Sequence, residues 1–257
     1  MTIQQVHDLI CSAEREAGEL ILHAHHIIAE QKTDIRNVVT EYDRRVQEHM
    51  MRTLSDALPD AHFFCEEMSH PDSLGVEHVF IIDPIDGTMN FVHGFGHSCI
   101  STAYMREGEI VGGVIFNPYR NELFSAVRGQ GAFLNGKPIH ASCLPLRESV
   151  ACFGSAPYSD DLTEQTFFLL RKVFEESLDI RREGAAALDL CSVAAGRAGL
   201  FYELELSLWD YAAGILIASE AGAICSNITG EPLPLDGQKS SVLAGSPLAV
   251  KQFLEWV

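Results

Sequence analysis

Positively charged residues are scarce in this sequence. Its 257 residues include eighteen Lys and Arg against thirty-six Asp and Glu, which gives a formal net charge of −18 at pH 7. Polyanions repel such a chain, so the charge balance argues against sequence-independent binding to nucleic acid or to an anionic membrane. A phosphate group could still bind where metal cations or helix N-termini reverse the local field.

Long apolar runs and paired cysteines are also missing. No apolar run approaches the roughly 20 residues that a membrane helix needs, and the N-terminus has no basic stretch followed by an apolar core. The seven cysteines are odd in number, widely spread and contain no C-x-x-C pair, which favours reduced, mostly buried thiols. We therefore expect a cytoplasmic protein with no membrane partner.

The chain contains no internal repeat, low-complexity tract or Gly/Ser/Pro linker. Its hydrophobic fraction of 47% and charged fraction of 21% are those of an ordinary globular protein, and its length allows an enzyme. We expect one unit over residues 1–257, made of two packed subdomains that divide near residue 145, approximately 1–145 and 146–257.

Hydrophobic periodicity predicts a layered α/β (α+β) architecture. Helical spacing indicates helices over 3–30, 42–58, 163–176, 185–196, 207–221 and 247–256. A buried strand is expected at 79–83, an antiparallel meander at 98–105, 110–116 and 122–127, and short strands at 150–153, 199–202, 223–226 and 242–244. Alternation of strands and helices in the second half is typical of packed α/β layers.

The most informative segment follows the strand at 79–83 and reads Asp83-Pro84-Ile85-Asp86-Gly87-Thr88-Met89-Asn90-Phe91. The strand fixes Asp83, proline restricts the backbone, and Gly87 permits a close turn, so two carboxylates and a backbone carbonyl can converge on hard cations. A bare D-x-x-D-G is as often an ordinary turn that satisfies local backbone hydrogen bonds. The nine residues together are far more specific.

Two distant segments add carboxylates. In Trp209-Asp210-Tyr211-Ala212, Ser207 is a plausible helix N-cap, which places Asp210 in the first helical turn. Phe64-Cys65-Glu66-Glu67 precedes Asp83 by about seventeen residues. Several carboxylates in one pocket repel one another unless cations are present, and oxygen ligands without His or Cys favour Mg²⁺ or Mn²⁺ over Zn²⁺.

These segments resemble the inositol monophosphatase family. The nine residues from Asp83 match its signature D-P-[IL]-D-G-T-x-N-[FY] throughout, and Trp209-Asp210-Tyr211-Ala212 matches its second signature, W-D-x-[AG]. Glu66 matches the family's Gly-Glu-Glu, with Cys65 in place of the glycine, and Asn37 stands where the family often has Asp. The resemblance spans most of the chain and implies a layered α-β-α-β-α sandwich, inositol monophosphatase/fructose-bisphosphatase-like, with metals between two subdomains.

The resemblance also implies residue roles. One metal would be held by Glu66, Asp83 and the Ile85 carbonyl, and a second by Asp83, Asp86 and Asp210, with two or three Mg²⁺ per site and Mn²⁺ as a substitute. Glu66 and Thr88 would orient the attacking water, with Asp43 supporting the Thr88 hydroxyl. The substrate would contact Asp86, Gly87, Thr88, Gly184, Ala185, Ala186, Glu203 and Asp210.

The reaction implied is hydrolysis of a phosphate monoester by in-line attack of a metal-activated water, with inositol 1-phosphate as the first candidate substrate. A nucleotide 3′-phosphatase, a sugar-bisphosphatase or another small-metabolite phosphatase is the alternative. A catalytically idle binding protein that keeps the fold is the alternative from a different class. The family also implies a homodimer and sensitivity to lithium. His23, His25 and His26 have no partner motif, and we interpret them as surface or partly packed residues of the first helix.

Overall fold

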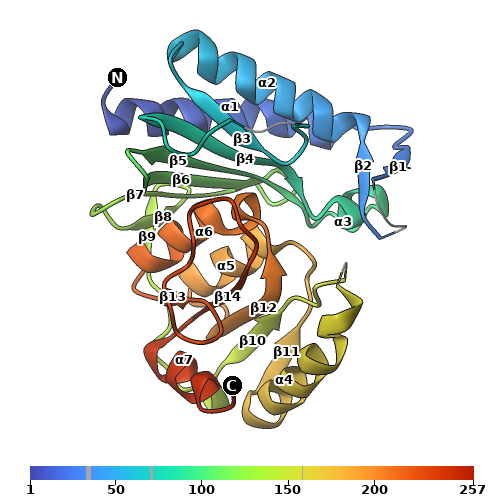
Figure 1. Cartoon of the computed structure of the whole chain (residues 1–257), viewed down its shortest axis with the longest axis vertical. Helices are drawn as coiled ribbons and strands as arrows, with labels where there is room; N and C mark the ends of the chain where they lie inside the picture. Colours follow the sequence, from blue (N-terminus) through green and yellow to red (C-terminus); the bar gives the residue numbers. More distant parts are fainter. Residues whose placement is uncertain (33–35, 70–71, 158) are drawn as a thin grey trace.

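Two β-sheets alternate with three layers of helices along the long axis of the molecule (Figure 1). The computed structural model describes residues 1–32, 36–69, 72–157 and 159–257. Three buried apolar clusters fill the spaces between successive layers. This order of layers confirms the α-β-α-β-α sandwich expected from the sequence.

The outer layer of the N-terminal half consists of α1 (Ile3–Leu22) and α2 (Glu41–Ala57), which cover one face of a seven-stranded sheet (Figure 1). Thr2 caps α1 and Thr40 caps α2, each through a capping box. The buried positions of α1 recur every three or four residues, which produces one apolar face toward the sheet. A two-stranded ribbon, β1 (Ala29–Gln31) with β2 (Val38–Thr40), connects the two helices.

The larger sheet has the strand order β3-β4-β5-β6-β7-β8-β9 and is antiparallel except for the β3–β4 pair. Its strands are β3 (His62–Cys65), β4 (His78–Asp86), β5 (Cys99–Arg106), β6 (Glu109–Asn117), β7 (Glu122–Val127), β8 (Ala132–Leu134) and β9 (Lys137–Ile139). The meander expected between residues 98 and 127 is therefore confirmed. The short helix α3 (Thr88–Val92) follows β4 directly.

The central layer consists of α5 (Ala186–Ala194) and α6 (Leu208–Glu220), which are almost entirely apolar because they are covered by a sheet on each side. The second sheet has the order β11-β10-β12-β14-β13. Its strands are β10 (Val150–Phe153), β11 (Asp179–Arg181), β12 (Leu200–Leu206), β13 (Ile224–Ser226) and β14 (Ser240–Gly245). Helices α4 (Thr163–Glu176) and α7 (Pro247–Leu254) cover its outer face, and 3₁₀ turns lie at Leu146–Glu148 and Asp160–Leu162.

The first helix is shorter than its apolar pattern predicts. It ends at Leu22, and the chain then turns through His26, whose φ is +52°, into β1. Ala24 and Ile27 still pack against the apolar cluster between the two outer helices and the larger sheet, although their backbone is irregular. Apolar spacing alone does not distinguish these two ways of reaching the core, so the prediction of a helix to residue 30 was wrong.

The seven strands of the larger sheet precede residue 145 and the five strands of the smaller sheet follow it. Helix α6 packs against both sheets, so the division into two subdomains stays a prediction. All seven cysteines are free thiols, and four of them are buried, as expected. Within the described ranges, no helix combines the length and apolar character that crossing a membrane would require.

Candidate metal and phosphate site

A cavity of about 580 Å³ lies where the end of β4, the starts of α5 and α6, and β12 meet. Eleven of the twelve residues predicted for the site line it: Glu66, Asp83, Ile85, Asp86, Gly87, Thr88, Gly184, Ala185, Ala186, Glu203 and Asp210. The twelfth, Asp43, is fully buried behind Thr88. The structure thus brings together residues from five separate segments of the chain.

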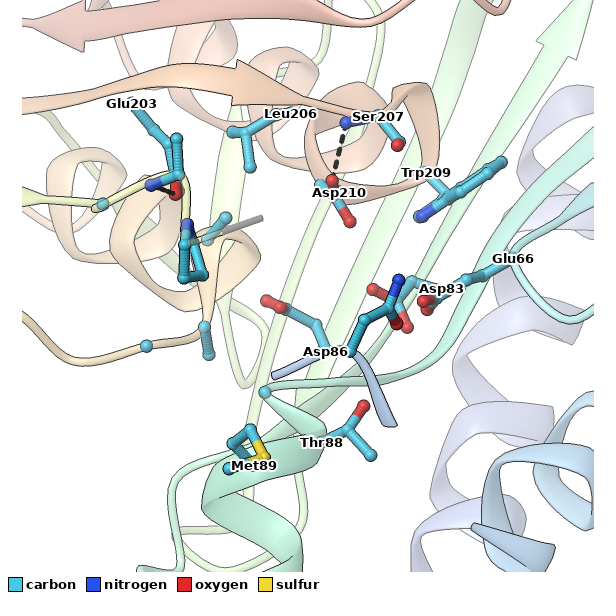
Figure 2. A pocket seen from close by; sticks show the side chains of 18 of the residues that line it. Glu66, Asp83, Asp86, Thr88, Met89, Glu203, Leu206, Ser207, Trp209 and Asp210 are labelled. Atoms are coloured by element: carbon cyan, nitrogen blue, oxygen red, sulfur yellow. Dashed lines mark hydrogen bonds between the residues drawn. The ribbon is translucent and has the colours of Figure 1, made fainter. Parts of the chain in front are cut away.

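An irregularity in β4 directs two carboxylates into the cavity. Asp83 pairs with Ser101 and Asp86 with Cys99, so three steps along β4 match two along β5. Residues three apart on a regular strand point to opposite faces, whereas the extra residue turns both aspartates toward one space (Figure 2). Proline at residue 84 suits this position because it has no N–H to donate to the ladder. The sequence predicted that the strand would end at Asp83, but it continues to Asp86.

Thr88 begins α3 immediately after Gly87, whose φ of +84° is in the left-handed region that favours glycine. The Thr88 hydroxyl lies 3.0 Å from the Ile85 carbonyl oxygen and 3.4 Å from Asp43 Oδ1. Asp43 Oδ2 accepts hydrogen bonds from the amide and the hydroxyl of Thr40, at 2.7 and 2.6 Å. The predicted contact between Asp43 and Thr88 is therefore present.

Asp210 lies in the first turn of α6, as the sequence predicts. Its Oδ2 accepts a hydrogen bond of 2.7 Å from the amide of Ser207, the N-cap residue. The ring of Trp209 lies 5.6 Å from that of Phe64 on β3, which ties the start of α6 to the segment that carries Glu66. Figure 2 shows the Asp210 carboxylate facing the space that Asp83 and Asp86 border.

Glu66 follows β3, and its Oε1 accepts a hydrogen bond of 2.9 Å from Lys32 Nζ. Lys32 also pairs with Glu67. Burial lowers the pKa of Lys32, but the charge of Glu66 and the hydrogen bonds with both glutamates outweigh this effect and raise it above its ordinary value. Cys65 points into the core between the sheet and the two outer helices, so its replacement of glycine leaves the cavity unobstructed.

The electrostatics of the cavity fit bound cations. Burial and the negative charges of Glu66, Asp86 and Asp210 raise the pKa of Asp83 well above its ordinary value. Burial, followed by the charges of Glu66 and Asp86, does the same for Asp210. Burial also raises the pKa of Asp86 to about 6, although the Ala187 amide opposes it. Divalent cations would relieve this repulsion, and the all-oxygen donor set suits Mg²⁺.

The carboxylates border a space and do not meet at a single point. Among the residues that the structure describes, no three His, Cys, Asp or Glu side chains form a ready-made metal cage. Mg²⁺ usually completes its octahedron with waters and substrate oxygens and takes only one or two carboxylates from the protein. The open arrangement of the carboxylates therefore suits cations that also bind water and substrate oxygens.

The start of α5 closes the cavity beside Asp86. The Ala187 amide donates a hydrogen bond of 2.7 Å to Asp86 Oδ2, so this helix N-terminus is held against the end of β4. Gly184, Ala185 and Ala186 lie just before and at this terminus. Ala185 and Ala186 are mostly buried, which leaves backbone to form much of this part of the wall.

Glu203 lies within β12 and not at a strand end (Figure 2). Its Oε1 accepts a hydrogen bond of 2.9 Å from the Ala156 amide. Burial raises the pKa of Glu203 to about 7, opposed by the Ala156 hydrogen bond and the charge of Arg182. A carboxyl group with this pKa can accept from or donate to substrate hydroxyls near neutral pH.

The four basic residues of the cavity, Lys32, Arg36, Arg182 and Lys239, escaped prediction. Lys32 and Arg182 line the cavity but belong to no motif, and only contacts with residues distant in the sequence give them their positions. The doublet Arg181-Arg182 is a weak signal, because the similar doublets Arg44-Arg45 and Arg171-Lys172 do not line the cavity. The three histidines are exposed, as expected, but they follow α1 and do not belong to it.

Comparison with known proteins agrees with this geometry. The model of the inositol monophosphatase family matches residues 2–255. Nus factor SuhB of Pseudomonas aeruginosa is 35% identical over 98% of this chain and 95% of its own length. Inositol-1-monophosphatase of Mesorhizobium japonicum is 38% identical over 85% of this chain and 82% of its own length.

Solved structures give the same result. Extragenic suppressor protein SuhB of Bartonella henselae superimposes with a TM-score of 0.90 at 33% identity and covers 96% of each chain. An IMPase/NADP phosphatase solved with Mg²⁺ and phosphate superimposes with a TM-score of 0.89 at 26% identity, covering 99% of this chain and 95% of the other. The chain therefore belongs to the inositol monophosphatase family.

Proposed function

We propose that the protein hydrolyses the phosphate monoester of a small polyhydroxylated alcohol in a Mg²⁺-dependent reaction, with inositol 1-phosphate as the first candidate. Water adds to phosphorus, the ester P–O bond breaks, and the alcohol leaves with a proton, which gives inorganic phosphate. The observation that carries the proposal is the set of four carboxylates on one cavity, Glu66, Asp83, Asp86 and Asp210. Four carboxylates can bind divalent cations, and the bound cations can in turn bind the phosphate group of a substrate.

The proposed metal ligands are Glu66, Asp83 and the Ile85 carbonyl for one ion, and Asp83, Asp86 and Asp210 for a second. Bound Mg²⁺ would supply a water of lowered pKa and would stabilise charge on the leaving oxygen. The Mg²⁺ and phosphate in the structure of a related IMPase/NADP phosphatase support this assignment. The lithium-soaked inhibitory complex of a staphylococcal inositol monophosphatase supports lithium sensitivity as a further expectation.

Thr88 and Glu66 are the residues that we propose orient the attacking water and accept its proton. The Thr88 hydroxyl donates toward Ile85 O or Asp43 Oδ1, so its lone pairs remain available to accept from water. Asp43 acts through Thr88 and is a positioning residue. The amides of Gly87 and Thr88 at the start of α3 are proposed to bind phosphate oxygens, with Gly87 allowing their close approach.

The alcohol is expected to contact Glu203, Asp210 and the segment Gly184–Ala186. Carboxyl groups that accept hydrogen bonds suit the hydroxyls of a polyol. Relatives named inositol-1-monophosphatase and a related structure with bound inositol monophosphate favour inositol 1-phosphate. Nucleotide phosphates remain the enzyme alternative, since one structural relative is named an NADP phosphatase.

Phosphate release from inositol 1-phosphate, with and without Mg²⁺, tests the proposal. We expect Mg²⁺-dependent turnover in the wild type, its loss in Asp83→Asn, and its retention in Asp236→Asn, an exposed aspartate outside the cavity. Release from another ester alone would change the substrate and keep the site. Release from no ester would overturn the proposal and favour a binding protein, a class left open by the relatives named Nus factor SuhB.

A homodimer is the proposed assembly. Helix α4 exposes Phe167, Phe168 and Phe174 at 59%, 53% and 60% of their surface, an apolar face of the kind that marks protein interfaces. Light scattering should give twice the chain mass for the wild type. A Phe174→Glu variant that remains a dimer would exclude this face as the interface.

A further inference from the structure

Arg182 lies on the same wall of the cavity as Glu203. Its Nη2 donates a hydrogen bond of 3.3 Å to Ser155 Oγ. Its Nη1 lies close to Gly184: a Cβ added to that glycine would be only 2.3 Å from the Nη1 atom. The guanidinium therefore fills the space left by Gly184, one of the residues expected to contact the substrate alcohol.

Arg182 differs from the other basic residues of the cavity in its partners. The other three each have a carboxylate oxygen within 3.0 Å: Lys32 with Glu66, Arg36 with Asp160, and Lys239 with Glu205. Among the described residues Arg182 forms no ion pair with a carboxylate, and its side chain donates instead to the neutral Ser155 hydroxyl. Arg182 is exposed to solvent, so a ligand can reach the guanidinium.

The neighbouring acids do not cancel the charge of Arg182 by contact. Glu203 directs Oε1 to the Ala156 amide, and a Cβ on Gly154 would lie 1.9 Å from its Oε2. Glu205 pairs with Lys239 and accepts a hydrogen bond from Ser159. This wall thus offers a guanidinium that has no carboxylate partner among the described residues, beside the carboxyl group of Glu203, in a protein whose net charge is −18.

We propose that Arg182 binds a second phosphate group on the alcohol part of the substrate, next to the hydroxyls that Glu203 contacts. The planar guanidinium matches phosphate oxygens in a two-pronged geometry, which makes Arg the usual residue for this task. This inference rests on the proposed hydrolysis at the carboxylate site. It makes polyol or sugar bisphosphates the preferred substrate class, with inositol 1-phosphate a slower substrate of the same site.

The test compares two substrates that share one ring, myo-inositol 1-phosphate and myo-inositol 1,4-bisphosphate. Wild-type kcat/KM should be higher for the bisphosphate. Arg182→Gln should lower kcat/KM for the bisphosphate by about tenfold or more, the order of one charge-assisted hydrogen-bonded pair, and by less than about twofold for the monophosphate. Arg182→Lys should retain part of the preference because it keeps the charge but loses the fork.

The control is Arg181→Gln. Arg181 is adjacent in sequence, exposed and paired with Asp179, and it does not line the cavity, so neither substrate should be affected. Equal losses for both substrates in Arg182→Gln would overturn the second-phosphate site while leaving the proposed hydrolysis intact. Hydrolysis of neither substrate by the wild type would overturn the proposed function, and this inference with it.

Discussion

The carboxylate of Glu203 occupies the space that a side chain on Gly154 would need. A Cβ added to Gly154 would lie 1.9 Å from Oε2 and 2.0 Å from Cδ of Glu203. Gly154 donates its amide to the Tyr202 carbonyl, so its backbone is fixed beside β12 and has little room to retreat. The glycine thus sets where the carboxyl group stands in the cavity.

Replacing Gly154 with Ala is expected to displace Glu203 and weaken binding of the substrate alcohol. The KM for inositol 1-phosphate should rise roughly tenfold, the scale of one lost buried hydrogen bond, whereas kcat changes less. Steady-state phosphate release measures both constants. Gly75→Ala is the matched control because its added Cβ meets only Ser73 Oγ at 3.5 Å. An unchanged KM in Gly154→Ala would mean that the position of Glu203 does not matter for substrate binding.

Glu14 is a carboxyl group that is buried away from the cavity. It is fully buried between α1 and the larger sheet, and neither carboxylate oxygen has a hydrogen-bond partner among the described residues. Burial raises its pKa well above the ordinary value of 4.5. The native chain therefore keeps this proton at pH values where the unfolded chain has lost it.

Raising the pH above 4.5 then favours unfolding, by up to about 1.4 kcal/mol per pH unit while only the native group holds its proton. Glu14→Gln removes this titration, so its melting temperature relative to the wild type should increase between pH 5 and pH 8. Glu48→Gln, an exposed site on the neighbouring helix α2, should show no such trend. A difference between Glu14→Gln and wild type that is constant with pH would contradict the assignment.

Bound Mg²⁺ should affect both the stability and the turnover of the protein. Mg²⁺ should raise the melting temperature of the wild type, because ions that bind only the folded chain stabilise it. In Asp210→Asn this increase should shrink, and turnover should fall by about a hundredfold or more. The amide oxygen of Asn can still accept from the Ser207 amide, so the start of α6 is retained. Without Mg²⁺ the variant should melt no lower than the wild type, since one repelling charge has been removed.

Asp236→Asn is the control for this measurement, as an exposed aspartate that does not line the cavity. It should retain the full Mg²⁺ response. An Asp210→Asn variant that responds to Mg²⁺ as strongly as the wild type would exclude Asp210 as a metal ligand.

How far the sequence could predict the site depends on how each residue is positioned. Asp83, Asp86, Thr88 and Asp210 belong to contiguous motifs, so their local backbone is encoded beside them and their convergence in the cavity could be predicted. The direction of Asp86 could not, because it depends on a β-bulge that forms only against β5. Apolar periodicity predicted the layers for the same reason that it misplaced the end of α1: it reports burial and not backbone conformation.

The charged residues of the cavity wall show the limit more clearly. Lys32 meets Glu66 across 34 positions and Arg182 meets Ser155 across 27. No local pattern encodes such pairs, because the local sequence does not determine which conformation or which distant partner a long lysine or arginine side chain adopts. Only the assembled sheets define which charged side chains of the cavity form ion pairs with one another.

The Thr88 hydroxyl is the proposed acceptor of a hydrogen bond from the attacking water. It lies 3.0 Å from Ile85 O and 3.4 Å from Asp43 Oδ1, so it can donate its hydrogen to one of these oxygens and keep its lone pairs free to accept from a water. Thr88→Val keeps the shape of the side chain and removes this acceptor. We expect kcat to fall by about a hundredfold, in the range of proton-transfer groups, with KM changed by less than about threefold.

Thr88→Ser restores the hydroxyl and should recover kcat to within about tenfold of the wild type, which separates the chemistry from packing. Asp43→Asn should lower kcat less than Thr88→Val does, because Asp43 acts through the threonine and does not itself reach the cavity. If Thr88→Val and Thr88→Ser had equal activity, the hydroxyl would have no part in activating water. Glu66 would then have to take the proton alone, and the Asp43 to Thr88 contact would serve only to hold α3 against α2.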